Sequence, residues 1–493
     1  MRRIVLVFAT VLLFFSDYPL AQGGFEERIT LWDPLGQTLD RIEEEVPGLI
    51  IQGLIRNVSD INLHGKTGRV GGIRTGDSRG RDTGIRPRKR RRRWESIEWL
   101  GELELNYFLT PNIELTNVLD FRYDAVFDWN GKDLSATAEK EQEYYRKTKQ
   151  ILRELHAKIY WNKLLLQIGK QQVVWGKMEG KVIDIINPDF DAWKGPTNSG
   201  ENFEFSRIPI WMANLLYLWR AYSINLIWVP DIEPDNWGIA SPGRAPGGPW
   251  SLDNDGDAHP LRVDRPSSSF KNHEWGFRMD AFEGGWNQGF FYFYSWNDTP
   301  TVFRRPWGRE AKHTRIHQMG YSLDKSFYLR EMDWVFRFES LYTLNQYLPN
   351  RSEPEWMDGV NKANSLRSTF SAETRWSRQI STSTQIWHNH WSGFHGKDRQ
   401  PGLTGWSRKR DWGGMLLSFS KPFKRFENRL KLGMTSYSYF SEGDFRIRSW
   451  AEWKVSDYVK LKTVFQAFAG NSNDVVGPYE DWDTLRFHLI YEF

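Results

Sequence analysis

The chain has 493 residues, a formal net charge of +4 and no cysteine. Without cysteine, disulfides cannot staple the fold, so its stability must come from a large hydrogen-bonded ladder or core. Tryptophan occurs 26 times and aromatic residues make up 15% of the chain, yet no segment after the N-terminus is apolar over the length of a membrane-spanning helix. This combination excludes a helical membrane bundle and favours a protein whose aromatic side chains meet a membrane–water interface.

The first 22 residues carry the features of a secretory signal peptide. Arg2 and Arg3 precede an apolar run over residues 4–15, and small residues follow around Ala21. The run is too short to cross a bilayer as a helix, which needs about 20 apolar residues. We expect export and cleavage near Ala21, with an uncleaved anchor as the alternative.

Residues 23–47 form a lead-in segment with helical spacing. Leu31, Leu35, Leu39 and Ile42 recur every three or four positions, and an acidic stretch follows them. This spacing predicts a short amphipathic helix. We expect it at the periplasmic mouth of the fold that follows or as a plug inside that fold, and a lead-in without function is the alternative.

From residue 48 onward, a two-residue alternation of apolar and polar side chains predicts strands. In the clearest case, Leu115 and Phe121 share one face with other apolar residues, while Glu114 and Asp120 lie on the other face. About 18 segments show this pattern. They are residues 48–58, 97–108, 113–127, 152–161, 163–174, 210–219, 222–229, 273–284, 288–296, 313–324, 327–344, 366–378, 381–391, 410–421, 428–439, 445–455, 458–468 and 485–493.

The connections between these segments alternate in length. Residues 110–112 and 456–457 are examples of the short kind, and residues 175–209 and 230–272 of the long kind. Bacterial outer-membrane barrels have short periplasmic turns, long extracellular loops and an even number of strands. We therefore expect an all-β fold, a transmembrane antiparallel β-barrel of about 18 strands (range roughly 16–18), over residues 48–493.

The last strand supports this prediction. Phe487, Tyr491 and Phe493 share its apolar face, and the sequence ends on the phenylalanine. It resembles the closing strand of outer-membrane barrels, and the resemblance implies recognition by the barrel-assembly machinery. We expect the protein in the outer membrane, surrounded by lipid and lipopolysaccharide.

Charged residues on the polar faces are the candidate selectivity residues of the lumen. The acidic set is Glu98, Glu102, Glu104, Glu114, Asp120 and Asp124, and the basic set is Arg429, Lys431, Arg446, Arg448, Lys454, Lys460, Lys462 and Arg486. Circular closure places the two sets roughly a quarter-turn apart. Walls of opposite charge create a transverse field that orients polar solutes and filters ions. The alternative is that these charges pair across strands and solvate the interior.

One stretch carries a family resemblance. Gly169-Lys170-Gln171-Gln172-Val173-Val174-Trp175-Gly176 is followed by Ile186-Asn187-Pro188 and by Arg207-Ile208-Pro209. This order resembles an uncharacterised family of porin-like Gram-negative outer-membrane barrels defined by a domain of unknown function. The resemblance implies a channel, sometimes working with an inner-membrane RND-type permease and a lipoprotein, and it transfers no catalytic residue.

The same stretch begins a long loop in which Pro188 and Pro209 act as breakers of regular structure. The loop either folds inward as a constriction or forms an extracellular cap. If it folds inward, the constriction candidates are Asp184, Asp189, Asp191 and Lys194.

The run Arg86-Pro87-Arg88-Lys89-Arg90-Arg91-Arg92-Arg93 in the first long loop is the strongest local charge. Outside the cell, it is suited to lipopolysaccharide phosphates or an anionic substrate, and an exported barrel excludes nucleic acid as its partner. We expect no catalytic residue, metal site or cofactor. The expected function is a channel for diffusion of small polar or charged solutes. The alternatives are an export conduit for a polymer or lipid-like substrate and an outer-membrane hydrolase with a rim active site.

Overall fold

The structure is a computed structural model and describes residues 35–63, 94–125, 147–178, 183–188, 207–235, 262–305, 308–349, 358–376, 380–395, 400–401, 406–407, 409–440, 443–470 and 483–493. Within these ranges, no helix has the length and apolar character needed to cross a membrane.

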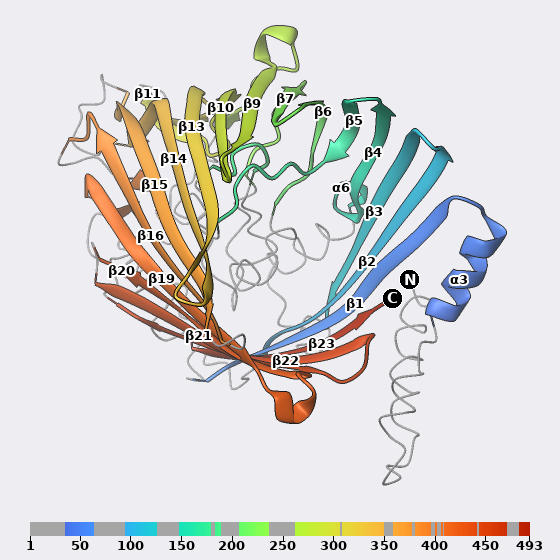
Figure 1. The fold of residues 1–493 in the computed structure, drawn as a ribbon. Coiled ribbons are helices and arrows are strands. Elements are labelled where there is room, and N and C mark those ends of the chain that lie inside the picture. The colour runs from blue at the N-terminus through green and yellow to red at the C-terminus, as the bar shows by residue number, and fades with distance from the viewer. Residues whose placement is uncertain are drawn as a thin grey trace, which may run out of the picture.

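Strands dominate the fold and form one closed antiparallel barrel of 18 strands, which confirms the predicted fold class (Figure 1). The sheet closes because β1 pairs with β2 on one side and with the last strand, β23, on the other. The barrel strands are β1 (Leu49–Asn62), β2 (Trp94–Thr110), β3 (Ile113–Asp124), β4 (Leu152–Trp161), β5 (Leu164–Gln171), β6 (Ile210–Trp219), β7 (Tyr222–Val229), β9 (Glu274–Glu283), β10 (Trp286–Trp296), β13 (Arg315–Leu329), β14 (Met332–Pro349), β15 (Val360–Trp376), β16 (Ile380–Ser392), β19 (Asp411–Pro422), β20 (Leu430–Tyr439), β21 (Asp444–Lys454), β22 (Val459–Ala469) and β23 (Thr484–Glu492).

The remaining described elements are short. A small sheet joins β8 (Arg262–Asp264), β11 (Thr301–Arg305) and β12 (Gly308–Lys312), and a two-stranded ribbon joins β17 (Gln400–Pro401) and β18 (Trp406–Ser407). The helical elements are α3 (Gly36–Glu45), α6 (Thr148–Ile151), η3 (Phe270–Asn272) and η5 (Lys424–Phe426).

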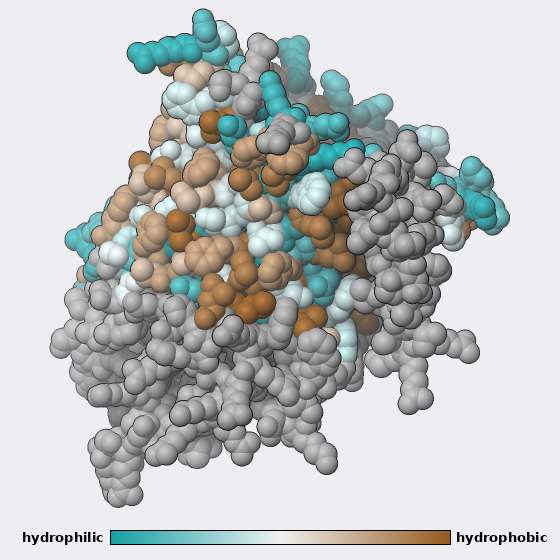
Figure 2. Space-filling view, turned by 90° about the horizontal axis from the view of Figure 1, so that it is seen from below, coloured by the Kyte–Doolittle hydropathy of each residue, from teal (hydrophilic) through white to brown (hydrophobic). Residues whose placement is uncertain are grey.

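Along most of the described wall, the strands turn apolar side chains outward and polar side chains inward. On β3, Glu114 and Asp120 are 7% and 4% exposed on the inward face, whereas Leu115 and Phe121 are 38% and 40% exposed on the outward face. Figure 2 shows brown and pale residues spread as a belt over part of the outer wall, with teal residues at its upper edge. An exposed apolar surface of this extent is unfavourable in water and suits contact with lipid.

Tight turns such as those after β4, β6 and β13 join strands at one end of the barrel, which we call the short-turn end. The strand ends at the other end, the long-loop end, lead into the long connections. Several short turns place residues at positive φ, such as Asn162 at 53° and Arg220 at 55°. In the turn between β13 and β14, both Arg330 and Glu331 have positive φ, at 52° and 61°. Positive φ at both central positions gives a turn whose twist matches that of the flanking strands.

Some strands extend further than their alternation predicts. The alternation in β14 ends near residue 344, but the strand continues to Pro349. Its pairing with β15 shifts register between Thr343 and Gln346, and Asn345 has a φ of 67°. A bulge at this point exchanges the two faces of the strand, so the sequence pattern breaks although the hydrogen-bonded ladder continues.

Helix α3 confirms the helix predicted in the lead-in segment, and it lies outside the barrel beside β1 and the C-terminus (Figure 1). Strand β1 runs past the end of β23, and Phe493, which follows β23, exchanges two backbone hydrogen bonds with Gly53. Beyond that pair, the N–H of Ile51 donates to the Glu43 carboxylate on α3. The helix therefore covers the unpaired edge of β1. Its described residues lie outside the barrel and do not plug the lumen.

Candidate functional site

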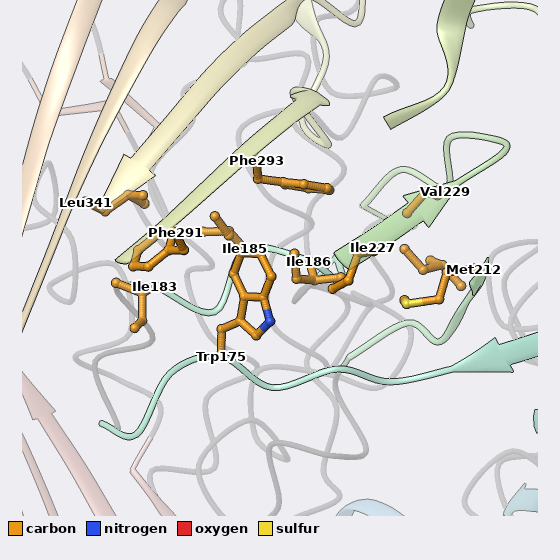
Figure 3. Packing of buried hydrophobic residues seen from close by; sticks show 11 residues of the cluster. Trp175, Ile183, Ile185, Ile186, Met212, Ile227, Val229, Phe291, Phe293 and Leu341 are labelled. Atoms are coloured by element: carbon orange, nitrogen blue, oxygen red, sulfur yellow. The ribbon is translucent and has the colours of Figure 1, made fainter. Parts of the chain in front are cut away.

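Two described parts of the connection between β5 and β6, residues 172–178 and 183–188, pass inside the ring of strands (Figure 1). We call these two parts the inner loop. Figure 3 shows Trp175 at the centre of a cluster between the inner loop and the barrel wall. The other members are Ile183, Ile185 and Ile186 of the inner loop and Ile210, Met212, Ile227, Val229, Phe291, Phe293 and Leu341 of strands β6, β7, β10 and β14. Of the two predicted courses, the described part therefore takes the inward one.

Two polar contacts and one glycine place Trp175 against the wall. Its indole N–H donates to Asn225 Oδ1 at 3.1 Å, and its carbonyl accepts from Arg278 Nη1 at 2.6 Å. Gly276 lies beneath the ring, since a Cβ there would be only 3.3 Å from the indole. The G-K-Q-x-V-x-W-G segment thus carries the side chain that anchors the inner loop.

Asn187 closes the base of the inner loop. Its carbonyl oxygen accepts from the Val173 N–H at 2.7 Å, and its amide donates to the carbonyls of Gln171 and Ile208 at 3.2 and 3.0 Å. One side chain therefore joins the segment that leaves β5 to the segment that enters β6. This geometry explains why asparagine stands before Pro188 in the motif.

Lys177 joins the inner loop to strands β13 and β14. Its backbone N–H donates to Glu339 Oε1 at 2.7 Å, and its ammonium forms an ion pair with Asp324. The Glu339 side chain is almost completely buried, at 1% exposure. The inner loop thus covers one continuous sector of the lumen wall, from β5 to β14. Lys177 holds the part of the loop that lies farthest from β5 against β13 and β14.

Of the four constriction candidates, Asp184 is described. It is 7% exposed and forms a buried ion pair with Arg207, so it stabilises the inner loop and does not face a solute. Asp189, Asp191 and Lys194 lie outside the described residues, as does the arginine run at residues 86–93. Whether the loop limits passage stays a prediction.

The acidic selectivity candidates lie on the inward faces of β2 and β3. They are Glu98, Glu102, Glu104, Glu114, Asp120 and Asp124, and basic residues of β3 and β4 pair with several of them. The ion pairs are Arg122–Glu98 at 3.0 Å, Arg122–Asp120 at 3.3 Å, Lys158–Glu114 at 2.8 Å and Arg153–Glu102. In this sector, the structure favours the alternative in which lumen charges neutralise one another across strands.

The basic candidates lie on β20 to β23 or in the turns beside them. They are Arg429, Lys431, Arg446, Arg448, Lys454, Lys460, Lys462 and Arg486. Arg486 makes two hydrogen bonds to Asp60, at 2.7 and 2.8 Å, and Lys460 lies 2.6 Å from Glu492. Since Asp60 belongs to β1, the acidic and basic sectors meet at the closing seam of the barrel.

The other basic candidates differ in position along the barrel axis. Arg446 donates to Gln466 Oε1 at 2.7 Å, and Arg448 is 8% exposed, so both lie deep in the wall. Arg429 and Lys454 lie at the short-turn end, where the side chain of Lys454 is 46% exposed. The contribution of each to ion selectivity stays a prediction.

The sequence did not single out the charged cluster beneath the inner loop. Arg278 of β9 binds Asp280 through hydrogen bonds of 2.7 to 3.0 Å, and Lys177 and Asp324 lie nearby on the same sector. The sequence does indicate the Arg278–Asp280 pair, because alternation over residues 273–284 places both side chains on the same face of one strand. Their contact with a loop about a hundred residues earlier carries no local signal.

No family model matches the chain, and no curated protein is significantly similar to it. Among solved structures, Pseudomonas aeruginosa OccK11 (OpdR) is 11% identical, with a TM-score of 0.48 over 91% of this chain and 96% of that one. Pseudomonas aeruginosa OpdL is 11% identical, with a TM-score of 0.48 over 90% and 98% of the two chains. Acinetobacter baumannii OccAB3 is 8% identical, with a TM-score of 0.49 over 91% of this chain and 100% of that one.

Proposed function

We propose that the protein is an outer-membrane channel through which small polar or charged solutes diffuse. The observation that carries this proposal is the closed ring of 18 strands, apolar outside and charged inside. Barrels with about 16 to 18 strands are wide enough to enclose water. Paired charges on the inner wall suit hydrated solutes, whereas an apolar conduit would line its lumen with the side chains that this barrel turns outward.

The channel function needs no catalytic group, and we propose that the protein is not an enzyme. Contact with outer-membrane lipid and lipopolysaccharide follows from the apolar belt. Assembly by the barrel-assembly machinery, and work with an RND-type permease and a lipoprotein, rest on the sequence resemblance and stay predictions.

Single-channel recording in planar lipid bilayers tests the proposal. The purified protein should give a steady current that rises linearly with voltage and differs for anions and cations. The other two functions make different predictions. A hydrolase would turn over a substrate without conducting, and an export conduit would conduct only with its envelope partners. A barrel that inserts fully and stays silent at every voltage would contradict the channel.

The basic sector provides the first prediction about selectivity. Replacing Arg448 and Lys462 by glutamine removes two positive charges from the inner wall, so the reversal potential in a salt gradient should shift towards cation preference. Lys325→Gln/Lys421→Gln is the matched control, because it also removes two positive charges, from the outward faces of β13 and β19, where the two ammonium groups lie over the rings of Trp286 and Phe423. An equal shift in the control, or none in the double variant, would show that these two residues do not filter ions.

A further inference from the structure

One stretch of the lumen wall is aromatic, and neither the charge pattern nor the inner loop accounts for it. It comprises Trp387, Trp412, Tyr437, Tyr439 and Phe468, which cluster across strands β16, β19, β20 and β22. We call these five residues the aromatic band. They belong to the inward faces, since residues of the opposite phase on the same strands, such as Ile386 on β16 and Leu417 on β19, are 46% and 43% exposed on the outer surface. Large aromatic side chains at this position are not needed for contact with lipid.

A glycine lies beneath the central ring of the band. Gly414 pairs with Trp387 on one side and with Tyr439 on the other. A Cβ at Gly414 would be 2.5 Å from the Trp387 ring, so the indole lies over the glycine and along the wall. Trp387 also meets Tyr439 edge to face, with ring centres 5.7 Å apart. The glycine thus makes room for a flat aromatic surface on the lumen side.

The same arrangement recurs nearer the short-turn end. On β21, Trp450 lies over Gly433 of β20, where an added Cβ would overlap the indole. The Nζ atoms of Lys431 and Lys462 each lie 5.5 Å from the centre of this ring. The wall formed by β16 to β22 therefore carries two indole surfaces at different depths, each over a glycine.

Polar groups accompany the rings. Arg446 lies 5.2 Å from the Tyr437 ring and 5.7 Å from the Phe468 ring, and Asp444 is opposite Tyr439 in register. The indole N–H of Trp412 is buried and has no hydrogen-bond partner among the described residues. A buried donor without a partner loses free energy that a ligand hydroxyl could restore. Aromatic surfaces with a few convergent polar groups are typical of small-molecule sites.

We propose that the aromatic band and Trp450 are successive stacking sites for the rings of a short carbohydrate that crosses the lumen. This proposal rests on the proposed channel function and names its solute class. A sugar ring has a flat face of C–H groups that packs on an aromatic ring, and its hydroxyls both donate and accept hydrogen bonds. The mixture of arginine, lysine, carboxylate and indole groups around the rings matches hydroxyls, whereas a purely cationic site would select charge alone.

Maltopentaose is the probe, applied to single channels in planar bilayers. It should interrupt the current of the wild-type protein for measurable times. In a Trp387→Ala/Trp450→Ala double variant, which removes both stacking surfaces, the blockage time should fall roughly tenfold, which corresponds to about 1.4 kcal/mol. Trp453→Ala is the matched control, since Trp453 lies on the same strand as Trp450 but is 50% exposed on the outer surface. It should leave blockage unchanged.

Further measurements separate the possible failures. Titration calorimetry of maltopentaose in detergent micelles measures binding without conduction, so a silent barrel that still binds would contradict the channel and retain the sugar site. Normal conductance without blockage or binding would overturn the sugar site and leave the channel. Blockage by benzoate but not by maltopentaose would also overturn it, in favour of an aromatic acid. If the double alanine variant fails to fold, Trp387→Phe/Trp450→Phe keeps smaller rings and should shorten blockage by a smaller factor.

Discussion

At the scale of single residues, the lumen charges are arranged mainly as pairs. Alternation places Arg486 on the inward face, but the predicted first strand ends at residue 58, before Asp60, whereas β1 continues to Asn62. Nor does it show that the two residues meet, because they are 426 residues apart in sequence. Their contact depends on which residues of β1 and β23 stand opposite each other, and that register is set by closure of the whole ring. A pattern within one strand contains no information about it.

The Asp60–Arg486 pair gives the prediction for this scale. Both side chains are 4% exposed, so Arg486→Met leaves a buried carboxylate without its partner and should cost about 3–5 kcal/mol. The double variant Asp60→Leu/Arg486→Met removes both charges and should recover much of that loss. Urea unfolding of the barrel in lipid vesicles measures the stability. Lys454→Met, which breaks an exposed pair, is the control and should have no measurable effect. A double variant as unstable as Arg486→Met would contradict the role of the ion pair.

At the scale of elements, the inner loop shows where prediction from sequence ends. The two prolines and the run before Trp175 indicated a long loop that either enters the lumen or caps it. The choice depends on the wall that the loop contacts. Phe291, Phe293 and Leu341 are inward-facing apolar residues on strands where polar ones would be expected, and they become meaningful only once the barrel brings them opposite Trp175.

Loosening the far side of the inner loop should change the current. Lys177→Met removes the ion pair with Asp324 but keeps the backbone hydrogen bond to Glu339, so the loop should stay inside and move more. Single-channel records should then show more frequent current fluctuations than those of the wild type. The mean conductance should stay within about twofold of the wild-type value. Lys325→Met is the matched control, because Lys325 contacts the Trp286 ring on the outer surface. Equal noise in the two variants would show that the ion pair does not restrain the loop.

At the scale of the whole molecule, alternation and the sorting of loops by length predicted the strand count and the closed ring. They succeed because lipid on one side and water on the other impose opposite polarity on successive residues. Prediction fails where that constraint ends, as at the Asn345 bulge, and at the seam, where α3 covers an edge that no pattern marks.

Closure itself is testable because the protein has no cysteine of its own. Ser59 and Phe487 are directly opposite each other across the seam. Directly paired residues have Cα atoms about 4.5–5.5 Å apart, within the range of a disulfide, whereas diagonal neighbours are about 7–8 Å apart. Ser59→Cys/Phe487→Cys should therefore oxidise readily and, after boiling in SDS, migrate faster than the reduced sample. Ser59→Cys/Leu485→Cys places the second thiol diagonally and should cross-link far less. Equal cross-linking in both variants would mean that the seam slides in register, and a cross-link in neither would mean that β1 and β23 do not close the ring.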